Sequence, residues 1–257
     1  MTFSEQIVYA MFKPSKYKEL IKLKRSRFAA FVIVLMLVLG IVTFVIPAGA
    51  LITGFGGFEK LFRGQLSSLT YSDGALHLDT PFRMDINGLT LLINTEHTMV
   101  EDEQLKRNGV YIAIGSETMR LAVTLDGQIM EYQNTDITGL FPEGFNCDSL
   151  IRMIPGIYVY MFAAFLVQCI GYFVKYGAIA LLYSLFINSV NKNMNLNLTF
   201  GEVFAICFYG QTLGIILSNF NAALGWLPTT IVSIIGIFIS IHMITASVVL
   251  MDPRNQV

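Results

Sequence analysis

The sequence predicts an integral membrane α-helical bundle with four transmembrane helices and an inserted extracytoplasmic all-β domain. Of its 257 residues, 54% are hydrophobic and only 14% are charged, and the mean hydropathy is +0.61. Ordinary soluble domains contain about 25% charged residues. The net charge of −1 gives no indication of a nucleic-acid partner. These values favour a chain whose partner is the lipid bilayer.

Charge is unevenly distributed along the chain. Residues 1–27 contain seven basic and two acidic residues, residues 59–152 contain seven basic and fourteen acidic residues, and residues 153–257 contain three basic and two acidic residues. We therefore divide the chain into a cytoplasmic basic leader (1–27), a first transmembrane helix (28–50), a β-rich domain (51–152) and a three-helix region (153–257).

The first transmembrane helix is predicted by an uninterrupted apolar run. The segment 28–46 contains no charged residue and is long enough to cross about 30 Å of hydrocarbon. A secretory signal peptide is the alternative, because Ala48-Gly49-Ala50 resembles a cleavage site. We favour an uncleaved anchor, since the run exceeds the usual apolar region of about 7 to 15 residues in signal peptides.

The second hydrophobic region predicts helices at about 154–187, 200–218 and 229–250. Lys175 interrupts the first of these, which leaves open whether the segment 154–190 crosses once or twice. We favour one long helix that projects past the inner interface, with Lys175 reaching toward the headgroups. Gly225 and Pro228 predict the turn between the last two helices, where Trp226 would be an interfacial anchor.

The basic residues predict the orientation. Lys and Arg accumulate on the cytoplasmic side of membrane proteins, so the leader should lie in the cytoplasm. With four crossings, Lys192 and Arg254 also fall inside, and both termini of a multi-pass protein of the bacterial cell membrane are then cytoplasmic. The acidic block lies outside.

Three dipeptides in the exterior block predict β-hairpins: Asp73-Gly74, Asn87-Gly88 and Asp126-Gly127. Such pairs favour two-residue turns between β-prone segments. We expect about seven short strands and an irregular return over 135–152. The predicted strands are 69–72, 75–78, 82–86, 89–94, 110–114, 119–125 and 128–132.

The exterior block offers few candidates for chemistry. His77 and Asp79 alternate on a predicted strand, and His97 lies near the acidic run 101–103, so a metal site is conceivable. No spacing matches a zinc or EF-hand pattern, and we favour a solvated acidic surface. We predict no metal ligands, no cofactor and no catalytic residues, and hence a protein that is not an enzyme.

The leader is a candidate membrane-surface element. Pro14 divides it into two short amphipathic segments. The first has an apolar stripe of Phe3, Ile7, Val8, Met11 and Phe12, and the second, between Lys16 and Arg27, has apolar residues interspersed among bases. The alternative is that the bases only determine orientation. The predicted membrane-surface residues are Lys13, Lys16, Lys22, Lys24, Arg25 and Arg27.

Four polar residues are predicted within the membrane, namely Gln168, Lys175, Gln211 and His242. Such residues are functional candidates, although hydrogen bonds between helices explain Gln168 and Gln211 equally well. Glu202 and Asn219 are expected near helix ends. Four helices without an acidic pair disfavour an ion-coupled transporter.

Several motifs carry a resemblance to a known family. The chain contains Met11-Phe12-Lys13-Pro14-Ser15-Lys16-Tyr17, Asp73-Gly74-Ala75-Leu76 and Asp79-Thr80-Pro81-Phe82, in that order around one anchor. This arrangement resembles the bacterial domain of unknown function 1189 family, whose helical part is similar to Yip-type membrane proteins. Some members are labelled maltodextrin utilisation proteins, which implies an association with sugar-transport loci but no established activity. No catalytic residues are established for the family, so none can be carried over to this sequence. Asn94-Thr95-Glu96 departs from the Asp-Thr pair expected there.

Two functional hypotheses follow. The first is a non-enzymatic membrane protein whose exterior domain binds or senses a small molecule, not identified by the sequence, and whose helices dock on a membrane-protein complex such as a transporter. The alternative is a Yip-like membrane scaffold or membrane-shaping protein that acts through its leader and bundle.

Overall fold

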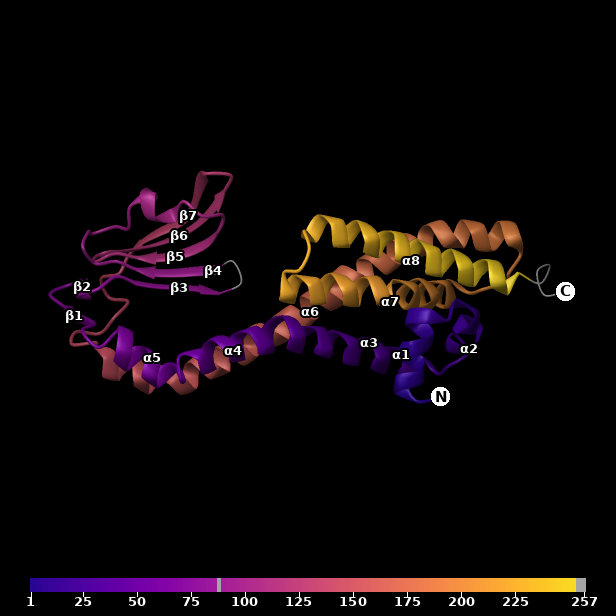
Figure 1. Cartoon of the computed structure of the whole chain (residues 1–257), viewed down its shortest axis with the longest axis horizontal. Helices are drawn as coiled ribbons and strands as arrows, with labels where there is room; N and C mark the ends of the chain where they lie inside the picture. Colours follow the sequence, from indigo (N-terminus) through magenta and orange to yellow (C-terminus); the bar gives the residue numbers. More distant parts are fainter. Residues whose placement is uncertain (87–88, 253–257) are drawn as a thin grey trace. The chain divides into compact units, whose positions relative to one another are not determined.

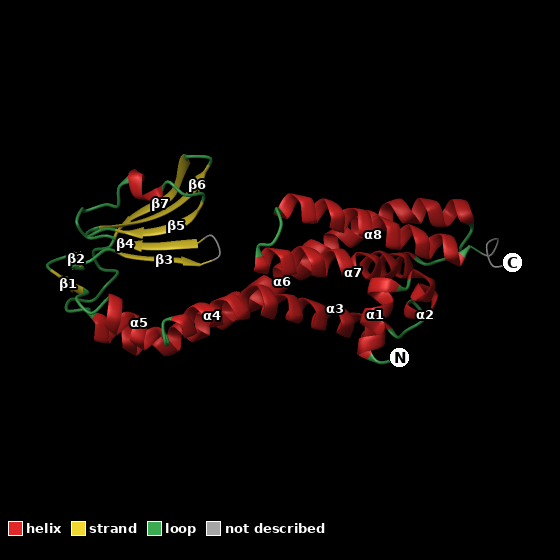
Figure 2. Ribbon diagram, viewed as in Figure 1, coloured by secondary structure: helices red, strands yellow, loops and turns green. Residues whose placement is uncertain are grey.

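The computed structural model describes residues 1–86 and 89–252 and divides into two compact units. The helical unit contains residues 1–47 and 161–257, and the β unit contains residues 48–160 (Figures 1 and 2). Within the described residues, four helices are long and apolar enough to cross a membrane, as predicted. The expected Asn87-Gly88 turn and Arg254 lie outside the described residues.

The leader folds as α1 (Phe3–Phe12), η1 (Pro14–Lys16) and α2 (Tyr17–Leu20), so the break at Pro14 is confirmed. Thr2 and Glu5 form a capping box at the start of α1. The leader packs against α7 and α8 and buries Gln6, Ala10, Tyr17 and Leu20 in doing so. One side of each leader segment is therefore covered by the helical unit, a packing that the amphipathic pattern alone did not predict.

The first apolar helix is continuous through α3 (Arg25–Gly40), the π-helical turn η2 (Ile41–Val45) and α4 (Ile46–Gly54). Its 30 residues extend the predicted segment 28–50 at both ends. Thr43 in η2 donates a hydrogen bond to the Leu39 carbonyl oxygen, 2.8 Å away. Such back-bonding is common where a helix deviates from regular α geometry.

One continuous helix, α6 (Cys147–Met194), contains 48 residues. It begins before residue 154, so the predicted irregular return ends at 146. Residues 147–160 belong to the β unit and residues 161–194 to the helical unit. The favoured interpretation of one long helix over residues 154–190 is therefore confirmed. Five residues separate its last residue, Met194, from the start of α7 at Phe200.

Two helices complete the helical unit, α7 (Phe200–Leu224) and α8 (Thr229–Met251). They pack closely, since a Cβ placed on Gly214 would lie 2.6 Å from the Gly236 carbonyl oxygen. The predicted end of α7 at residue 218 is wrong: the helix continues to Gly225, whose left-handed φ of 65° terminates it. Trp226, in the following turn, is 77% exposed.

Apart from residues 87–88, which are not described, the β unit contains seven strands, and every predicted strand has a counterpart. The observed strands are β1 (Thr70–Ser72), β2 (Ala75–His77), β3 (Phe82–Ile86), β4 (Leu89–Ile93), β5 (Gly109–Ile114), β6 (Thr118–Leu125) and β7 (Gln128–Asp136). Asp73-Gly74 and Asp126-Gly127 adopt positive φ at both positions, as their turns require.

The strands form a β1–β2 hairpin and a five-stranded sheet in the order β3-β4-β5-β6-β7. All neighbours are antiparallel except β4 and β5, which run parallel with Leu91 opposite Ile112. A parallel pair needs a crossover connection. The connection, residues 94–108, contains the short 3₁₀ helix η3 (Asp102–Leu105).

The β unit has two hydrophobic clusters. The first joins α5 (Phe58–Gln65), the β1–β2 hairpin and the first turns of α6. The second lies between the crossover and the sheet, where Leu105 and Tyr111 are fully buried. The second cluster therefore fixes the crossover against the sheet.

Candidate functional site

A hollow of about 530 Å³ opens on the β unit between the β3–β4 edge and the crossover. Three of its lining residues are basic and two are acidic. The lining consists of Pro81, Arg83, Leu92, Asn94, Glu96, Glu103, Gln104, Lys106 and Arg107. A concave site with converging polar groups is the usual form of a small-ligand site.

Hydrogen bonds orient one wall of the hollow. Arg83 on β3 donates to both carboxylate oxygens of Asp85, over 3.1 and 3.2 Å, and Thr90 on β4 donates to the same carboxylate. The Arg83 guanidinium and the Thr90 hydroxyl hold the pKa of Asp85 below its usual range. The positive charge of Arg83 is therefore compensated by the Asp85 carboxylate. Lys106 and Arg107 are the remaining basic residues of the lining that could bind a ligand.

The opposite wall of the hollow is formed by the crossover, which several hydrogen bonds hold in place. Arg107 donates its backbone N–H to the Tyr111 hydroxyl, which in turn donates to the Arg107 carbonyl oxygen. The Asn94 amide donates to Gln104 over 3.3 Å. A wall with so many fixed contacts is preorganised, which lowers the entropic cost of binding.

Arg120 on β6 links the crossover to the sheet through ion pairs and a hydrogen bond. Its side chain is buried, forms ion pairs with Asp102 (2.9 Å) and Glu131 (2.8 Å), and donates to the Val100 carbonyl oxygen (2.7 Å). An arginine fork suits this role, because several donors act at once. Sequence reasoning missed Arg120, since nothing in the local pattern distinguishes it from a solvated base.

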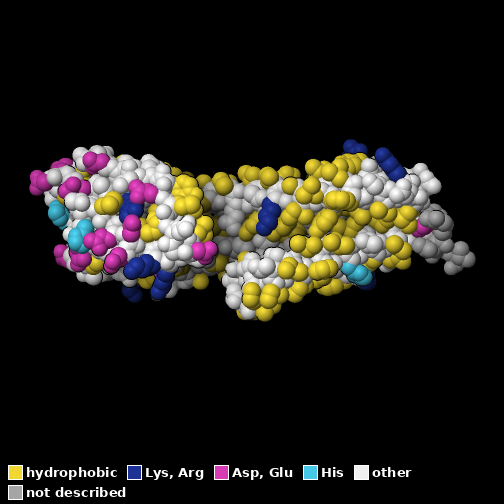
Figure 3. Space-filling model, turned by 90° about the horizontal axis from the view of Figure 1, so that it is seen from above, with side chains coloured by type: hydrophobic (Ala, Val, Ile, Leu, Met, Phe, Trp, Pro, Cys, Tyr) yellow, Lys and Arg dark blue, Asp and Glu magenta, His cyan; other side chains and the backbone are white. Residues whose placement is uncertain are grey.

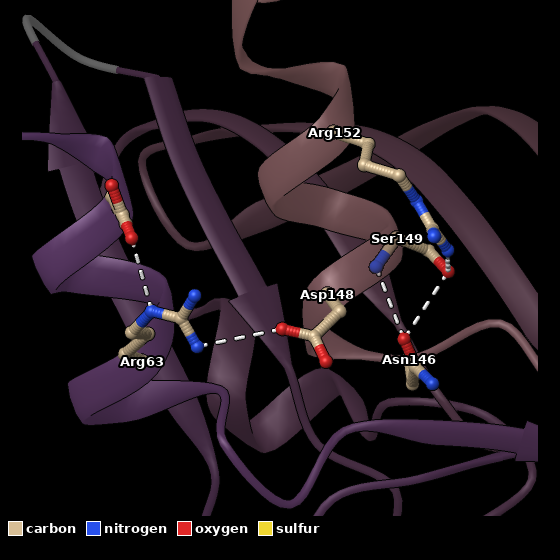
Figure 4. A network of polar contacts seen from close by, with 6 residues as sticks. Arg63, Asn146, Asp148, Ser149 and Arg152 are labelled. Carbon is tan, nitrogen blue, oxygen red and sulfur yellow. Dashed lines mark hydrogen bonds and ion pairs between the residues drawn. The ribbon is translucent and has the colours of Figure 1, made fainter.

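The first turn of α6 forms a polar junction with α5 (Figure 4). Asn146 accepts hydrogen bonds from the Ser149 backbone N–H (3.0 Å) and hydroxyl (3.2 Å), and so caps α6. Arg63 on α5 lies 3.4 Å from the Asp148 carboxylate. Thr70 of β1 pairs with Asn146. The start of α6 is thus fixed to both α5 and the β1–β2 hairpin.

The structure does not assemble the metal site considered from the sequence. Strand β2 ends at His77, so Asp79 does not alternate with it on one strand face. His97 lies 3.5 Å from Glu101, as a surface pair. Within residues 1–86 and 89–252, no three His, Cys, Asp or Glu side chains are grouped as metal ligands.

The predicted intramembrane residues fall into two groups. Gln168 donates to Thr43 (3.1 Å) and to Tyr172 (2.8 Å), and so joins α6 to η2. Gln211 donates to the Tyr176 carbonyl oxygen and so joins α7 to α6. By contrast, Lys175 and His242 are exposed on α6 and α8.

Two polar residues expected at helix ends behave differently. Glu202 forms a capping box with Thr199 and is a helix-end residue, as expected. Asn219 instead lies inside α7, is buried, and donates to the Tyr176 hydroxyl and the Ile215 carbonyl oxygen. Tyr176 is therefore held at both its backbone and its ring by α7.

The predicted membrane-surface bases occupy the outside of the leader and the start of α3. Lys16 pairs with Glu19, Arg27 donates to the Met1 carbonyl oxygen over 2.6 Å, and Lys13 lies 5.4 Å from the centre of the Tyr9 ring. Lys22, Lys24 and Arg25 are exposed. Gln6 donates to the Tyr209 hydroxyl (2.7 Å), a contact between leader and α7 that the sequence did not reveal.

The fold defines a class: a protein with four helices that could span a membrane and a separate β-sheet unit. Residues 5–250 match the model of the family described as "Protein of unknown function (DUF1189)". The chain belongs to this family, as its motifs indicated. No curated protein and no solved structure matches the chain.

Proposed function

We propose that this chain is a non-enzymatic multi-pass protein of the bacterial cell membrane. Its β unit lies outside the cell and binds a small polar ligand, and its helices dock on a membrane complex such as a transporter. The basic leader and the acidic β unit support this orientation, because translocated segments avoid Lys and Arg. The hydrophobic covering of the helical unit and the acidic side chains on the β unit agree with it (Figure 3).

The continuity of α6 carries this proposal. The helix begins at the junction of Asn146, Asp148 and Arg63 and continues without a break to Tyr176. Tyr176 accepts hydrogen bonds from Gln211 and Asn219 of α7. Coupling between two sites requires an element on which both act. In our proposal, ligand binding in the β unit biases the position of α6, and the bundle transmits that bias to its partner.

The hollow supports a small polar ligand that carries acidic or hydroxyl groups. Lys106 and Arg107 offer donors, Glu96 and Glu103 offer acceptors, and the buried Leu92 provides an apolar floor. We propose to follow the thermal unfolding of the full-length chain in detergent with glutamate, maltose and inorganic phosphate as separate probes. A ligand that binds the folded state raises the unfolding temperature.

We expect at least one probe to stabilise the wild type and the Lys60→Ala control, whose exposed base lies away from the hollow. The Arg107→Ala variant should lose that stabilisation. If Arg107→Ala responds like the wild type, or if no probe stabilises the wild type, the hollow is not the binding site for these classes of ligand.

The docking role is tested by purifying the tagged full-length chain from native membranes in mild detergent and identifying co-purifying proteins by mass spectrometry. We expect one membrane protein in near-stoichiometric amount. Recovery of this chain alone contradicts docking on a stable complex.

A membrane-shaping scaffold remains the second candidate, because Val8 and Phe12 are 43% and 61% exposed beside leader bases. Replacing Lys22, Lys24, Arg25 and Arg27 by Gln, in a chain whose topology is verified, distinguishes the two roles. A scaffold loses its function although its topology is retained, whereas a sensor retains its ligand response.

A further inference from the structure

Lys175 is an exposed charged residue in the long apolar middle part of α6. It is the only Lys, Arg, Asp or Glu between residues 153 and 191. Its ammonium group lies 5.1 Å from the centre of the adjacent Tyr176 ring. Among residues 1–86 and 89–252, no carboxylate lies within ion-pair distance of it. Its positive charge is therefore not compensated by any carboxylate among the described residues.

The contacts of Tyr176 give the depth of Lys175 in the helical unit. The Gln211 amide lies 2.8 Å from the Tyr176 carbonyl oxygen, and Gln211 is at the middle of the 25-residue helix α7. At about 1.5 Å per residue, this point is about 17 Å from the start of α7 and about 20 Å from its end. The four-carbon stem of a lysine spans only about 6 Å. If α7 crosses the bilayer, Lys175 therefore lies near the middle of the bilayer, deeper than the position near the inner interface that the sequence suggests.

A lysine at such a depth is costly when it faces lipid, and intramembrane charges usually pair with a partner or line an interior. The surroundings of Lys175 favour a helix as partner. Ala164, Gly171 and Ala178 are spaced by seven residues and exposed, so they share one stripe of α6 that passes beside Lys175. A Cβ on Gly171 would meet nothing within 4 Å. Small residues allow close approach of a second helix, and no packing within this chain requires Gly171 to be small.

The charge determines which helix fits. The segments 28–46, 153–190 and 203–251 contain no Asp or Glu, so a second copy of this chain cannot supply a carboxylate at this depth. We infer that the α6 stripe of Ala164, Gly171 and Ala178, with Lys175, docks against a transmembrane helix of a different protein that carries an Asp or Glu near the middle of the bilayer. This inference rests on the proposed docking function and names its surface.

In-cell photo-crosslinking of the full-length chain tests the inference. A photoreactive phenylalanine replaces Gly171 in one variant and Phe173 in the control. Phe173 is 55% exposed and lies at similar depth, but 200° away around the helix. We expect the Gly171 position to crosslink to a membrane protein that also co-purifies with the unmodified chain, and the Phe173 position not to do so.

The charge is tested in the same crosslinking background. Lys175→Glu should reduce the crosslink yield at least about tenfold, whereas Lys175→Arg should change it by less than about twofold. Changing the partner's intramembrane Asp or Glu to Lys should restore the yield with Lys175→Glu. Since Lys175 is exposed, all variants should keep the wild-type unfolding temperature.

Four results would overturn the inference. A crosslinked product of two copies of this chain would show that the surface mediates self-association and does not bind a helix of a different protein. Equal crosslink yields from the Gly171 and Phe173 positions, or a yield that Lys175→Glu does not change, would refute the proposed surface. If a partner still co-purifies in that case, the proposed docking function stands. If no partner co-purifies and no crosslink forms, the proposed docking function fails together with the surface.

Discussion

The Gln211 side-chain amide donates a hydrogen bond to the Tyr176 backbone carbonyl oxygen over 2.8 Å, and Gln211 is only 2% exposed. The bond joins two helices at a point where water is excluded. In the same pair of helices, Asn219 donates to the Tyr176 hydroxyl. This double attachment makes Tyr176 the fixed point of α6 within the helical unit.

Replacing Gln211 by Leu should therefore destabilise the chain. The substitution removes the bond while keeping a similar volume, and interhelical hydrogen bonds in membrane proteins contribute about 1 kcal/mol. Thermal unfolding in detergent measures the effect. The His242→Leu control, at an exposed site on α8, should unfold within about 0.5 kcal/mol of the wild type. Equal stability of both variants would show that the contact is energetically silent.

Gly214→Ala should destabilise the packing of α7 on α8. The added Cβ would lie 2.6 Å from the Gly236 backbone carbonyl oxygen, which cannot move without shifting α8. Overpacking of this kind costs about 1 to 3 kcal/mol. Gly171→Ala is the matched control, because its Cβ enters open space. Both are compared by unfolding in detergent, and a neutral Gly214→Ala would contradict the described helix contact.

Arg120→Ala should release the crossover that forms one wall of the hollow. The change removes the pairs with Asp102 and Glu131 and the bond to the Val100 carbonyl oxygen. Because Asp102 is well exposed, we expect a loss of about 2 kcal/mol rather than the larger cost of a fully buried pair. Hydrogen exchange should become faster over residues 94–105, and Lys106→Ala should leave it unchanged. Unaltered exchange in Arg120→Ala would contradict the anchoring role.

Asp85 should contribute to acid sensitivity of the β unit. Its folded-state pKa is lowered, first by the hydrogen bond from Arg83 and then by that from Thr90. A carboxylate of lowered pKa stabilises the fold above its unfolded-state pKa of about 3.9, and this contribution disappears as the pH falls through the folded-state value. Unfolding temperatures between pH 2 and pH 6 should fall less steeply for Asp85→Asn than for the wild type. Parallel profiles would show that the pair contributes nothing.

The sequence was informative where local rules dominate. Apolar length predicts the four helices, and Asp-Gly pairs predict the turns at 73–74 and 126–127, because only a few residues tolerate positive φ. Pro14 likewise predicts the break in the leader. In each case the cause lies within a few residues of the effect.

The missed features depend on residues far apart in the chain. The parallel pairing of β4 with β5 is set by the burial of Leu105 and Tyr111, which no local pattern encodes. The hollow combines residues 81–83 with residues 92–107 and emerges only after the crossover folds back. Asn219 was assigned to a turn because its type favours turns, whereas its partner Tyr176 lies 43 residues away.

In the proposed orientation, the β unit lies outside the cell and the leader lies inside. Single cysteines test it in intact cells, in a chain whose Cys147, Cys169 and Cys207 are replaced by Ala. The exposed positions Gln128 in the β unit and Lys18 in the leader each receive one cysteine and are treated with a membrane-impermeant maleimide. We expect Gln128→Cys to be labelled without permeabilisation and Lys18→Cys only after it. Labelling of Lys18→Cys in intact cells, with Gln128→Cys protected, would contradict the account.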